Sequence, residues 1–465
     1  MIRSIGLILS GNLASAALMM LRTLLVSRLI SLEDFGIAST FLLALAMIEM
    51  MSALGFQQQM MQAKDGNEPA FQGALQGFSV VRGAINALLL FALAGPMAWF
   101  FDIPQALWAF QLIALVPFVS GFVHFDLHRL SRRMHYLPSV MVALLPPVGS
   151  LISVVPLYHL FGDYRVLLFS ILVQMGLGVL VSHLFAQRRY LLRFDGPLIL
   201  RSLQFGWPIM ISGALMFLVF NGERAIIGRA LGLEVLALFS MALSLTLTPA
   251  LVISRTTMNF FLPQLSAARG RAGYAPLAMA TLQVHILLGC VMVVGVALMG
   301  GPFLQSVLGD KYAAAIPLLT WLAVLQAFRV FEGGCAVVAL AAAHTKNEML
   351  ANIVRVSLLP VAWLVVARGG DVMTVIWIGM LGEAAGFAVG LMLALIRQGL
   401  ALRPLLVPLC AAGVLMAVAC WTAGQGVGWQ VGLGLLALLV AVGFAMPDLQ
   451  IYLRKRTAVG HLEEG

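Results

Sequence analysis

Long apolar runs, most of them about 18–25 residues in length, follow one another through almost the whole sequence. A run of this length crosses the hydrocarbon core of a bilayer, about 30 Å thick, as an α-helix. A transmembrane β-barrel would instead show shorter segments of alternating polar and apolar residues. Only 10% of the residues are charged and 61% are hydrophobic, whereas a soluble domain carries about 25% charged residues. The sequence therefore predicts an all-α polytopic membrane protein.

About fourteen transmembrane helices can be placed on these runs. The first run contains Arg22 and Arg28 and lacks a small-residue cleavage site, so we interpret it as a span and not as a signal peptide. The predicted spans lie at 5–30, 36–60, 79–101, 105–126, 138–160, 165–187, 205–229, 235–258, 277–300, 313–336, 347–367, 373–396, 404–421 and 429–446.

Positive charges divide unequally between alternate loops. The loops of one side hold Arg3, Lys64, Arg129, Arg132, Arg133, Arg188, Arg189, Arg193, Arg201, Arg269, Arg271, Lys346, Arg397, Arg403, Arg454, Lys455 and Arg456. The loops of the other side hold Arg165, Lys311 and Arg368. Because lysine and arginine concentrate in cytoplasmic loops, both termini are predicted to be cytoplasmic. The outward loops are only a few residues long, which leaves no room for a soluble catalytic domain.

The phrase "SRLISLEDFG" (27–36) has a second copy, "GRALGLEVLA" (228–237). The copies align Arg28 with Arg229 and Glu33 with Glu234, and six predicted spans separate them. Six is even, so both copies have the same orientation, as in parallel transporter repeats. We therefore predict two pseudo-symmetric six-helix lobes, 1–203 and 204–403.

The last pair of spans lies outside this repeat. No charged residue occurs from Leu405 to Pro447, which favours a peripheral transmembrane hairpin over 404–447. A cytoplasmic tail is predicted over 448–465.

Several charged residues fall within or beside the predicted spans. The basic ones are Arg22, Arg28, Arg82, Arg224, Arg229, Arg255, Arg329 and Arg355, and the acidic ones are Glu49, Asp126, Glu223, Glu332 and Glu383. A charge at the bilayer centre costs about 2.5–3.5 kcal/mol, and such groups usually face a bundle interior or a wet cavity. The excess of arginine predicts a cationic cavity, and the planar guanidinium fork suits an anionic, phosphorylated substrate.

The substrate-binding candidates are Arg22, Arg28, Arg224, Arg229, Arg255 and Arg355. For Arg28 and Arg229, near span ends, snorkelling to the interface is an equal alternative. The ion-coupling candidates are Glu49 and Glu223; Glu49 could instead partner an arginine, and Glu223 and Arg224 could neutralise each other. Arg329 and Glu332, three residues apart on a helix, are predicted to pair.

No metal, cofactor or nucleic-acid site is predicted. His124 and His128 are four residues apart, but they run into the basic loop with no further ligand nearby in sequence. There is no CxxC spacing and no Walker motif. The net charge of +9 is read as a topology signal rather than as a nucleic-acid surface.

The stretch "LLVSRLISLEDFGIASTFLLAL" resembles the start of the bacterial oligosaccharide flippases of the multidrug/oligosaccharidyl-lipid/polysaccharide exporter (MOP) superfamily. In that family an arginine, a leucine and an acid-Xaa-[Phe/Tyr]-Gly turn close the first span. The matching residues here are Arg28, Leu29, Glu33, Phe35 and Gly36. The stretch "LQFGWPIMIS" is similar to the family's Phe-Gly-Xaa-Pro entry to the seventh span, through Phe205, Gly206 and Pro208. Where the family commonly has an aspartate before its seventh-to-eighth turn, this chain has Glu223 and Arg224.

The resemblance implies a carrier and not an enzyme. It would move undecaprenyl-pyrophosphate-linked oligosaccharide units across the bacterial inner (cytoplasmic) membrane for O-antigen, capsule or exopolysaccharide biosynthesis, by alternating access through the cationic cavity. Implied partners are the lipid-linked substrate, membrane lipid, a polysaccharide polymerase with its chain-length machinery, and a proton or sodium ion.

Two other functions stay open. A cation-coupled multidrug exporter of the same superfamily usually has twelve spans and an acid-led cavity. A membrane polysaccharide polymerase or ligase usually has a sizeable external loop.

Overall fold

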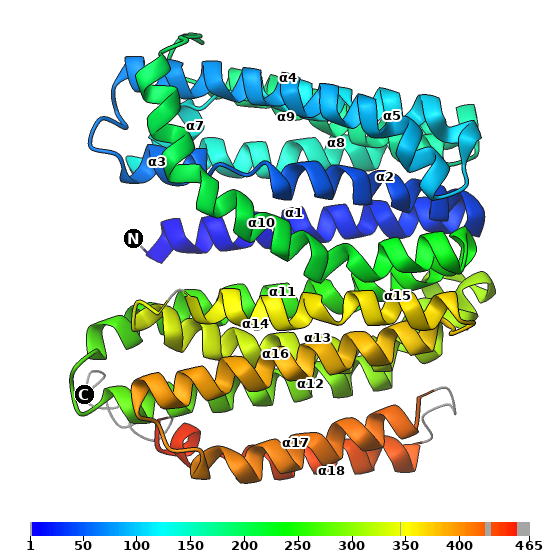
Figure 1. Cartoon of the computed structure of the whole chain (residues 1–465), viewed down its shortest axis with the longest axis vertical. Coiled ribbons are helices and arrows are strands. Elements are labelled where there is room, and N and C mark those ends of the chain that lie inside the picture. The colour runs from blue at the N-terminus through cyan, green and yellow to red at the C-terminus, as the bar shows by residue number, and fades with distance from the viewer. Residues whose placement is uncertain (1, 345, 424–428, 453–465) are drawn as a thin grey trace. The chain divides into compact units, whose positions relative to one another are not determined.

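A computed structural model of the chain describes residues 2–344, 346–423 and 429–452, and all regular secondary structure within them is helical (Figure 1). The first ten α-helices and one 3-10 helix are α1 (Ile2–Leu29), α2 (Leu32–Met51), α3 (Phe56–Gln62), α4 (Pro69–Phe100), η1 (Pro104–Ala106), α5 (Leu107–Ile113), α6 (Leu115–Ser120), α7 (Asp126–Arg132), α8 (Leu137–Phe161), α9 (Arg165–Leu184) and α10 (Gly196–Ala230). The remaining helices are α11 (Leu233–Ala268), α12 (Tyr274–Leu308), η2 (Asp310–Ala315), α13 (Ile316–Ala341), α14 (Lys346–Ser357), α15 (Leu359–Ala367), α16 (Val372–Gln398), α17 (Arg403–Trp421) and α18 (Trp429–Phe444). Most of the predicted tail, including Arg454, Lys455 and Arg456, lies outside the described residues.

Within these described residues, eleven helices are long and apolar enough to cross a membrane. Two shorter apolar helical segments lie at Pro104–Ser120 and Gln430–Phe444, and α1 covers the first predicted span. The prediction of an all-helical, multi-pass membrane protein is therefore confirmed. The count of fourteen spans stays a prediction.

The chain packs as two compact units, Met1–Ala237 and Leu238–Gly465. In the first unit, α10 packs on α2 and α4 and so belongs with the helices that precede it. The boundary between the two packing units thus falls near the start of α11. The six-helix lobes 1–203 and 204–403, which rest on the sequence repeat, stay a prediction.

Three of the predicted spans are broken in the structure. Between α2 and α3 the chain turns at Gly55, whose φ of +65° favours glycine. The break between α5 and α6 precedes Pro117, and the break between α14 and α15 precedes Pro360. A proline inside a helix removes a hydrogen bond and collides with the carbonyl four residues earlier, so both breaks have a local cause.

The two copies of the repeated phrase contact each other within the first unit. A Cβ added to Gly36 would lie 2.2 Å from the backbone oxygen of Leu233. Further along α2, a Cβ on Gly213 of α10 would lie 1.9 Å from the backbone oxygen of Met50. Small residues allow membrane helices to approach closely. These two glycines therefore bring α10 and the start of α11 directly against α2.

The core of the second unit forms where α12, α13, α16 and α17 meet. The rings of Phe331 and Phe387 pack edge to face there, with centroids 5.6 Å apart. The predicted C-terminal hairpin consists of α17 and α18, which pack on α12. Leu405 and Leu415 of α17 are fully buried in this core, so α17 packs into its unit. The separate peripheral hairpin over 404–447 stays a prediction.

Candidate functional site

Arg22 is a buried arginine on α1 with neutral hydrogen-bond partners. Only 4% of its side chain is exposed. Its Nη1 donates to Ser150 Oγ of α8 at 3.0 Å and to Gln174 Oε1 of α9, while Nε has no hydrogen-bond partner. Within the part of the chain that the structure describes, no carboxylate forms an ion pair with it. An uncompensated cation inside the membrane is costly and attracts an anion.

The partners of Arg22 are themselves held in place. Ser150 is fully buried and donates to the backbone oxygen of Ser170 at 2.7 Å, which links α8 to α9. Ser150 and Gln174 lie 128 and 152 residues from Arg22 in sequence. Neither residue is predicted from the sequence, because a serine or glutamine in an apolar run is a weak signal until the fold shows its neighbour.

Glu49 lies beside the break between α2 and α3 and is exposed on its unit. Arg82 of α4 donates to the backbone oxygen of Ser52 at 3.0 Å, and Asn86 donates to Ser52 Oγ at 2.8 Å. These two side chains satisfy polar groups that the broken helix leaves open. Arg82 is also within electrostatic reach of Glu49. Among the described residues no ion pair joins Glu49 to Arg82, so both alternatives for Glu49, ion coupling and an arginine partner, stay predictions.

Glu223 and Arg224 lie together on α10, with Glu223 buried and Arg224 half-buried. Arg224 Nη1 donates to Asn221 Oδ1 at 3.3 Å, one helical turn earlier. Adjacent residues on a helix point in different directions. Their roles in ion coupling and substrate binding stay predictions.

Arg28 and Arg229 are exposed, near the C-terminal ends of α1 and α10. The guanidinium carbon of Arg229 lies 5.6 Å from the ring centroid of Trp99, which is itself exposed. Arginine stacked on tryptophan is typical of a membrane–water interface. This contact fits the snorkelling alternative for Arg229.

Arg255 is exposed on the second unit, well inside the long helix α11. Among the residues that the structure describes, its side chain has no hydrogen bond or ion pair. A lone arginine at membrane depth is costly against lipid and is expected to face water or an anion.

A buried ion network joins α13, α14 and α16 in the second unit. Arg329 Nε lies 2.6 Å from Glu383 Oε1, and Arg355 Nε lies 3.0 Å from Glu383 Oε2. Arg355 Nη2 lies 3.2 Å from Glu332 Oε2. The predicted pair of Arg329 with Glu332 is therefore wrong: both charges instead have partners on other helices, which a spacing of three residues cannot reveal.

Gly386 of α16 makes room for this network, because a Cβ there would lie 2.7 Å from Arg355 Cγ. A Cβ on Gly390 would make only an ordinary contact with Glu332, 3.5 Å from its Cγ. Arg355 thus sits against the glycine-lined face of α16 with two carboxylate partners. Its role as a substrate ligand stays a prediction.

Asp126 lies outside the spans, at the start of the short helix α7, and not at the end of a span as the sequence suggested. Its carboxylate accepts from Arg129 at 2.5 Å and from the backbone N–H groups of Gln187 and Arg188 at 2.8 and 3.2 Å. Burial alone raises the pKa of Asp126, but these hydrogen bonds more than offset it and hold the pKa below its usual value. The carboxylate thereby ties α7 to the loop that follows α9.

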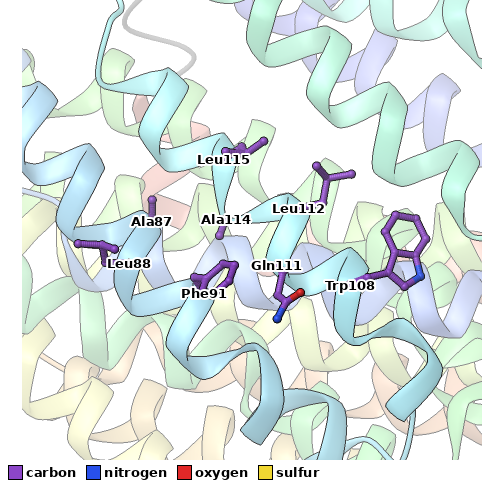
Figure 2. Close-up of a pocket in the computed structure, with 8 residues that line it drawn as sticks. All are labelled: Ala87, Leu88, Phe91, Trp108, Gln111, Leu112, Ala114 and Leu115. Carbon is purple, nitrogen blue, oxygen red and sulfur yellow. The ribbon is translucent and has the colours of Figure 1, made fainter.

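An apolar groove of about 450 Å³ runs between α4 and the broken pair α5 and α6 (Figure 2). Gly83 and Gly121 bring α4 and α6 together beside it, since a Cβ on Gly83 would lie 2.7 Å from the oxygen of Pro117. Phe91 and Trp108 flank the groove, and Gln111 is its one strongly polar lining side chain (Figure 2). Such a lining suits hydrocarbon and offers nothing to a charged group.

Comparison with known proteins identifies relatives of the sequence. Residues 25–317 match the family model described as polysaccharide biosynthesis protein. The chain is 25% identical over 332 residues to the succinoglycan biosynthesis transport protein ExoT of Rhizobium meliloti, covering 69% of this chain and 65% of that protein. It is 19% identical over 342 residues to the teichuronic acid biosynthesis protein TuaB of Bacillus subtilis, covering 72% of this chain and 70% of that protein.

Solved structures share the fold. The lipid II flippase MurJ in an inward closed conformation matches with a TM-score of 0.72 at 12% identity, over 97% of this chain and 99% of that chain. An inward-facing MATE-family multidrug resistance transporter of the MOP superfamily matches with a TM-score of 0.64 at 14% identity, over 82% of this chain and 94% of that chain. The helical fold is therefore that of MOP-type transporters, and the chain belongs to the polysaccharide biosynthesis protein family.

Proposed function

We propose that this protein moves a pyrophosphate-linked lipid oligosaccharide from the cytoplasmic to the outer leaflet of the bacterial cytoplasmic membrane, for assembly of a surface polysaccharide. One observation carries the proposal. Arg22 is buried among membrane helices, bound to a serine and a glutamine, with no carboxylate ion-paired to it in the described chain. A phosphate group is the natural counter-charge for such a guanidinium.

In this proposal Ser150 and Gln174 orient Arg22 without neutralising it. The guanidinium plane is fixed by Nη1, so its charge is available to a substrate phosphate. Arg255, on the second unit, is a further candidate cation without a partner among the described residues. The sugars and pyrophosphate cross the membrane by alternating access, while the hydrocarbon tail stays in the bilayer.

The comparisons support the substrate class. One relative is named a succinoglycan biosynthesis transport protein, and a second is named a teichuronic acid biosynthesis protein. A structure of the same fold is named a lipid II flippase. Translocation of a lipid-linked precursor is compatible with all three names and with the transporter fold of the solved structures.

The nearest alternative is a cation-coupled drug exporter, which would need a binding site dominated by acidic side chains. Two of the embedded acids that the structure describes, Glu332 and Glu383, are ion-paired with arginine. Glu49 lies within electrostatic reach of Arg82. Coupling of transport to a proton or sodium ion through Glu49 or Glu223 remains part of the proposal, as does association with a polysaccharide polymerase and its chain-length machinery.

The test measures lipid-linked glycan on each membrane leaflet in a strain that lacks this protein. Glycan is expected to accumulate on the cytoplasmic side and to be restored by the wild-type chain. Arg22→Ala is expected to lower export by at least about tenfold, because the free energy of one hydrogen bond to a charged group corresponds to a factor of this size. Arg22→Lys should restore part of it, because lysine supplies the charge without the planar fork.

Arg271→Ala is the control, because Arg271 is exposed in the loop after α11. It should export as the wild type does. Normal outer-leaflet glycan in the deletion strain would overturn the flippase proposal. Full export by a stably expressed Arg22→Ala variant would overturn the role of Arg22 alone.

A further inference from the structure

A small cavity with two arginines and two glutamines among its lining residues lies at the beginning of α4, apart from the buried arginine of α1. Its volume is about 220 Å³. Its lining comes from the first two turns of α4 and from the loop after α9, and consists of Pro69, Gln72, Gly73, Gln76, Arg188, Arg189 and Leu191. The positive charges of the surrounding loops predict that this end of the unit faces the cytoplasm.

The loop is fastened across α4 by several hydrogen bonds. Gln76 Nε2 donates to the backbone oxygen of Leu191 at 2.7 Å, and the backbone N–H of Arg193 donates to the oxygen of Gly73 at 3.0 Å. Gln72 and Gln76 are almost completely buried and bonded to each other. The cavity wall is therefore built into the fold and is not a chance gap between mobile loops.

Two arginines line this cavity in different ways. Arg188 Nη1 donates to the backbone oxygen of Asn67 at 2.9 Å and to Gln72 Oε1 at 3.3 Å, so its guanidinium is fixed by neutral acceptors. Arg189 is exposed, and within the described chain it has no side-chain partner. The guanidinium of Arg188 is thus held in place before any ligand binds, and the guanidinium of Arg189 is available to a ligand.

The cavity lies in a region of excess positive charge. Burial, and then the neighbouring cations Arg129 and Arg133, lower the pKa of Arg188, and Asp126 compensates only in part. Asp126 is already ion-paired with Arg129. A bound anion would compensate part of this excess positive charge around Arg188.

We propose that this cavity binds a phosphate group at the cytoplasmic border of the membrane. Arg188 and Arg189 bind its oxygens, and the site shares no lining residue with Arg22 and its hydrogen-bond partners. The phosphate can belong to the headgroup of an anionic phospholipid, since α4 enters the apolar layer at this point, or to a soluble phosphorylated molecule. Basic pockets at the cytoplasmic ends of membrane helices bind anionic headgroups in this way.

The experiment measures ligand binding by the full-length protein purified in detergent. One arm titrates phosphatidylglycerol, with phosphatidylcholine as the neutral reference, and counts bound lipids by native mass spectrometry. The other arm titrates inorganic pyrophosphate by calorimetry. Arg189→Gln is the test variant, and Arg271→Gln, an equally exposed arginine of the second unit, is the matched control.

Arg189→Gln is expected to weaken binding of the probe by about fivefold, because one arginine near an anionic surface contributes a factor of about this size to the binding constant. Arg271→Gln is expected to leave binding unchanged. A loss confined to phosphatidylglycerol assigns the site to a lipid headgroup, and a loss of pyrophosphate binding assigns it to a soluble phosphate. Unchanged binding of both probes by Arg189→Gln, or no binding of either by the wild type, overturns the proposal. The readout is direct binding of probes that are not the transport substrate, so this result is independent of whether glycan export requires the protein.

Discussion

At the scale of single residues, the sharpest constraints fall on glycines and on buried charges. Gly36 belongs to the repeated phrase, and the backbone oxygen of Leu233 occupies the place where its Cβ would lie. The glycine is therefore required for contact between the two copies of the phrase. Conformational freedom is not the reason, because Gly36 lies within the regular helix α2.

Gly36→Ala is expected to destabilise the protein by about 1–3 kcal/mol, the cost of forcing an extra methyl group into a packed contact. Thermal or denaturant unfolding in detergent measures this change. Gly95→Ala is the matched control, because Gly95 is also helical and a Cβ there meets no atom within 4 Å. The control should be neutral or stabilising by about 0.5–1 kcal/mol. Equal stability of both variants would show that α2 and α11 can separate without cost.

Asp126→Asn is expected to destabilise the first unit by about 3–5 kcal/mol, because it leaves the buried Arg129 unpaired. The pKa of Asp126 is lowered in the folded state. Its contribution is therefore fully present above the unfolded pKa of about 3.9 and is lost as the pH falls through the lower folded value. The wild type and the variant should differ fully at pH 7 and converge below about pH 4.

Asp65→Asn serves as the comparison for that experiment. Its ion pair with Arg201 is partly exposed, with 26% and 51% of the two side chains accessible. Exposed pairs contribute about 0–1 kcal/mol. A loss at Asp126 no larger than the loss at Asp65 would contradict the interpretation of Asp126 as a buried tie between α7 and the loop after α9.

At the scale of helices, one of the three broken spans, α14 and α15, adjoins the ion network. The helix pair α14 and α15 bends just after Arg355, whose side chain is the hub of the network. Arg355 fits against α16 only because Gly386 has no side chain. Two features thus adjoin the bend between α14 and α15: the ion pairs of Arg355 and the close contact of Arg355 with Gly386.

Glu332→Leu and Arg355→Met are each expected to cost about 3–5 kcal/mol, because each leaves a buried charge with less compensation. The double variant removes both charges and should recover about half of the summed loss or more. Unfolding in detergent measures the three variants against the wild type. Additive losses would contradict a direct interaction between Glu332 and Arg355.

At the scale of the whole molecule, the loop charges predict the orientation in the membrane. In a cysteine-free background, Arg133→Cys and Arg271→Cys should react with a membrane-impermeant thiol reagent only when it reaches the cytoplasmic side. Arg165→Cys and Lys311→Cys should react from outside. Labelling of all four from one side would contradict the predicted topology and with it the placement of both termini in the cytoplasm.

Much of the fold could be predicted from the sequence, and the candidate site only in part. Apolar runs of spanning length are local signals, so helices and their membrane setting follow from them directly. The helix breaks before Pro117 and Pro360 could not be predicted in this way, because other prolines, such as Pro146 and Pro147 in α8, lie inside unbroken helices. The family resemblance at Arg28 to Gly36 agrees with the family match that begins at residue 25.

The partners of the charges could not be predicted in this way, because hydrogen bonds and ion pairs form between helices that are distant in sequence. Local spacing paired Arg329 with Glu332, whereas the structure pairs Arg329 with Glu383, 54 residues away. The same applies to Arg22, whose serine and glutamine partners lie on α8 and α9. The sequence by itself determined that arginines enter the membrane. Only the tertiary structure decided which of them are neutralised, because that depends on which helix faces pack together.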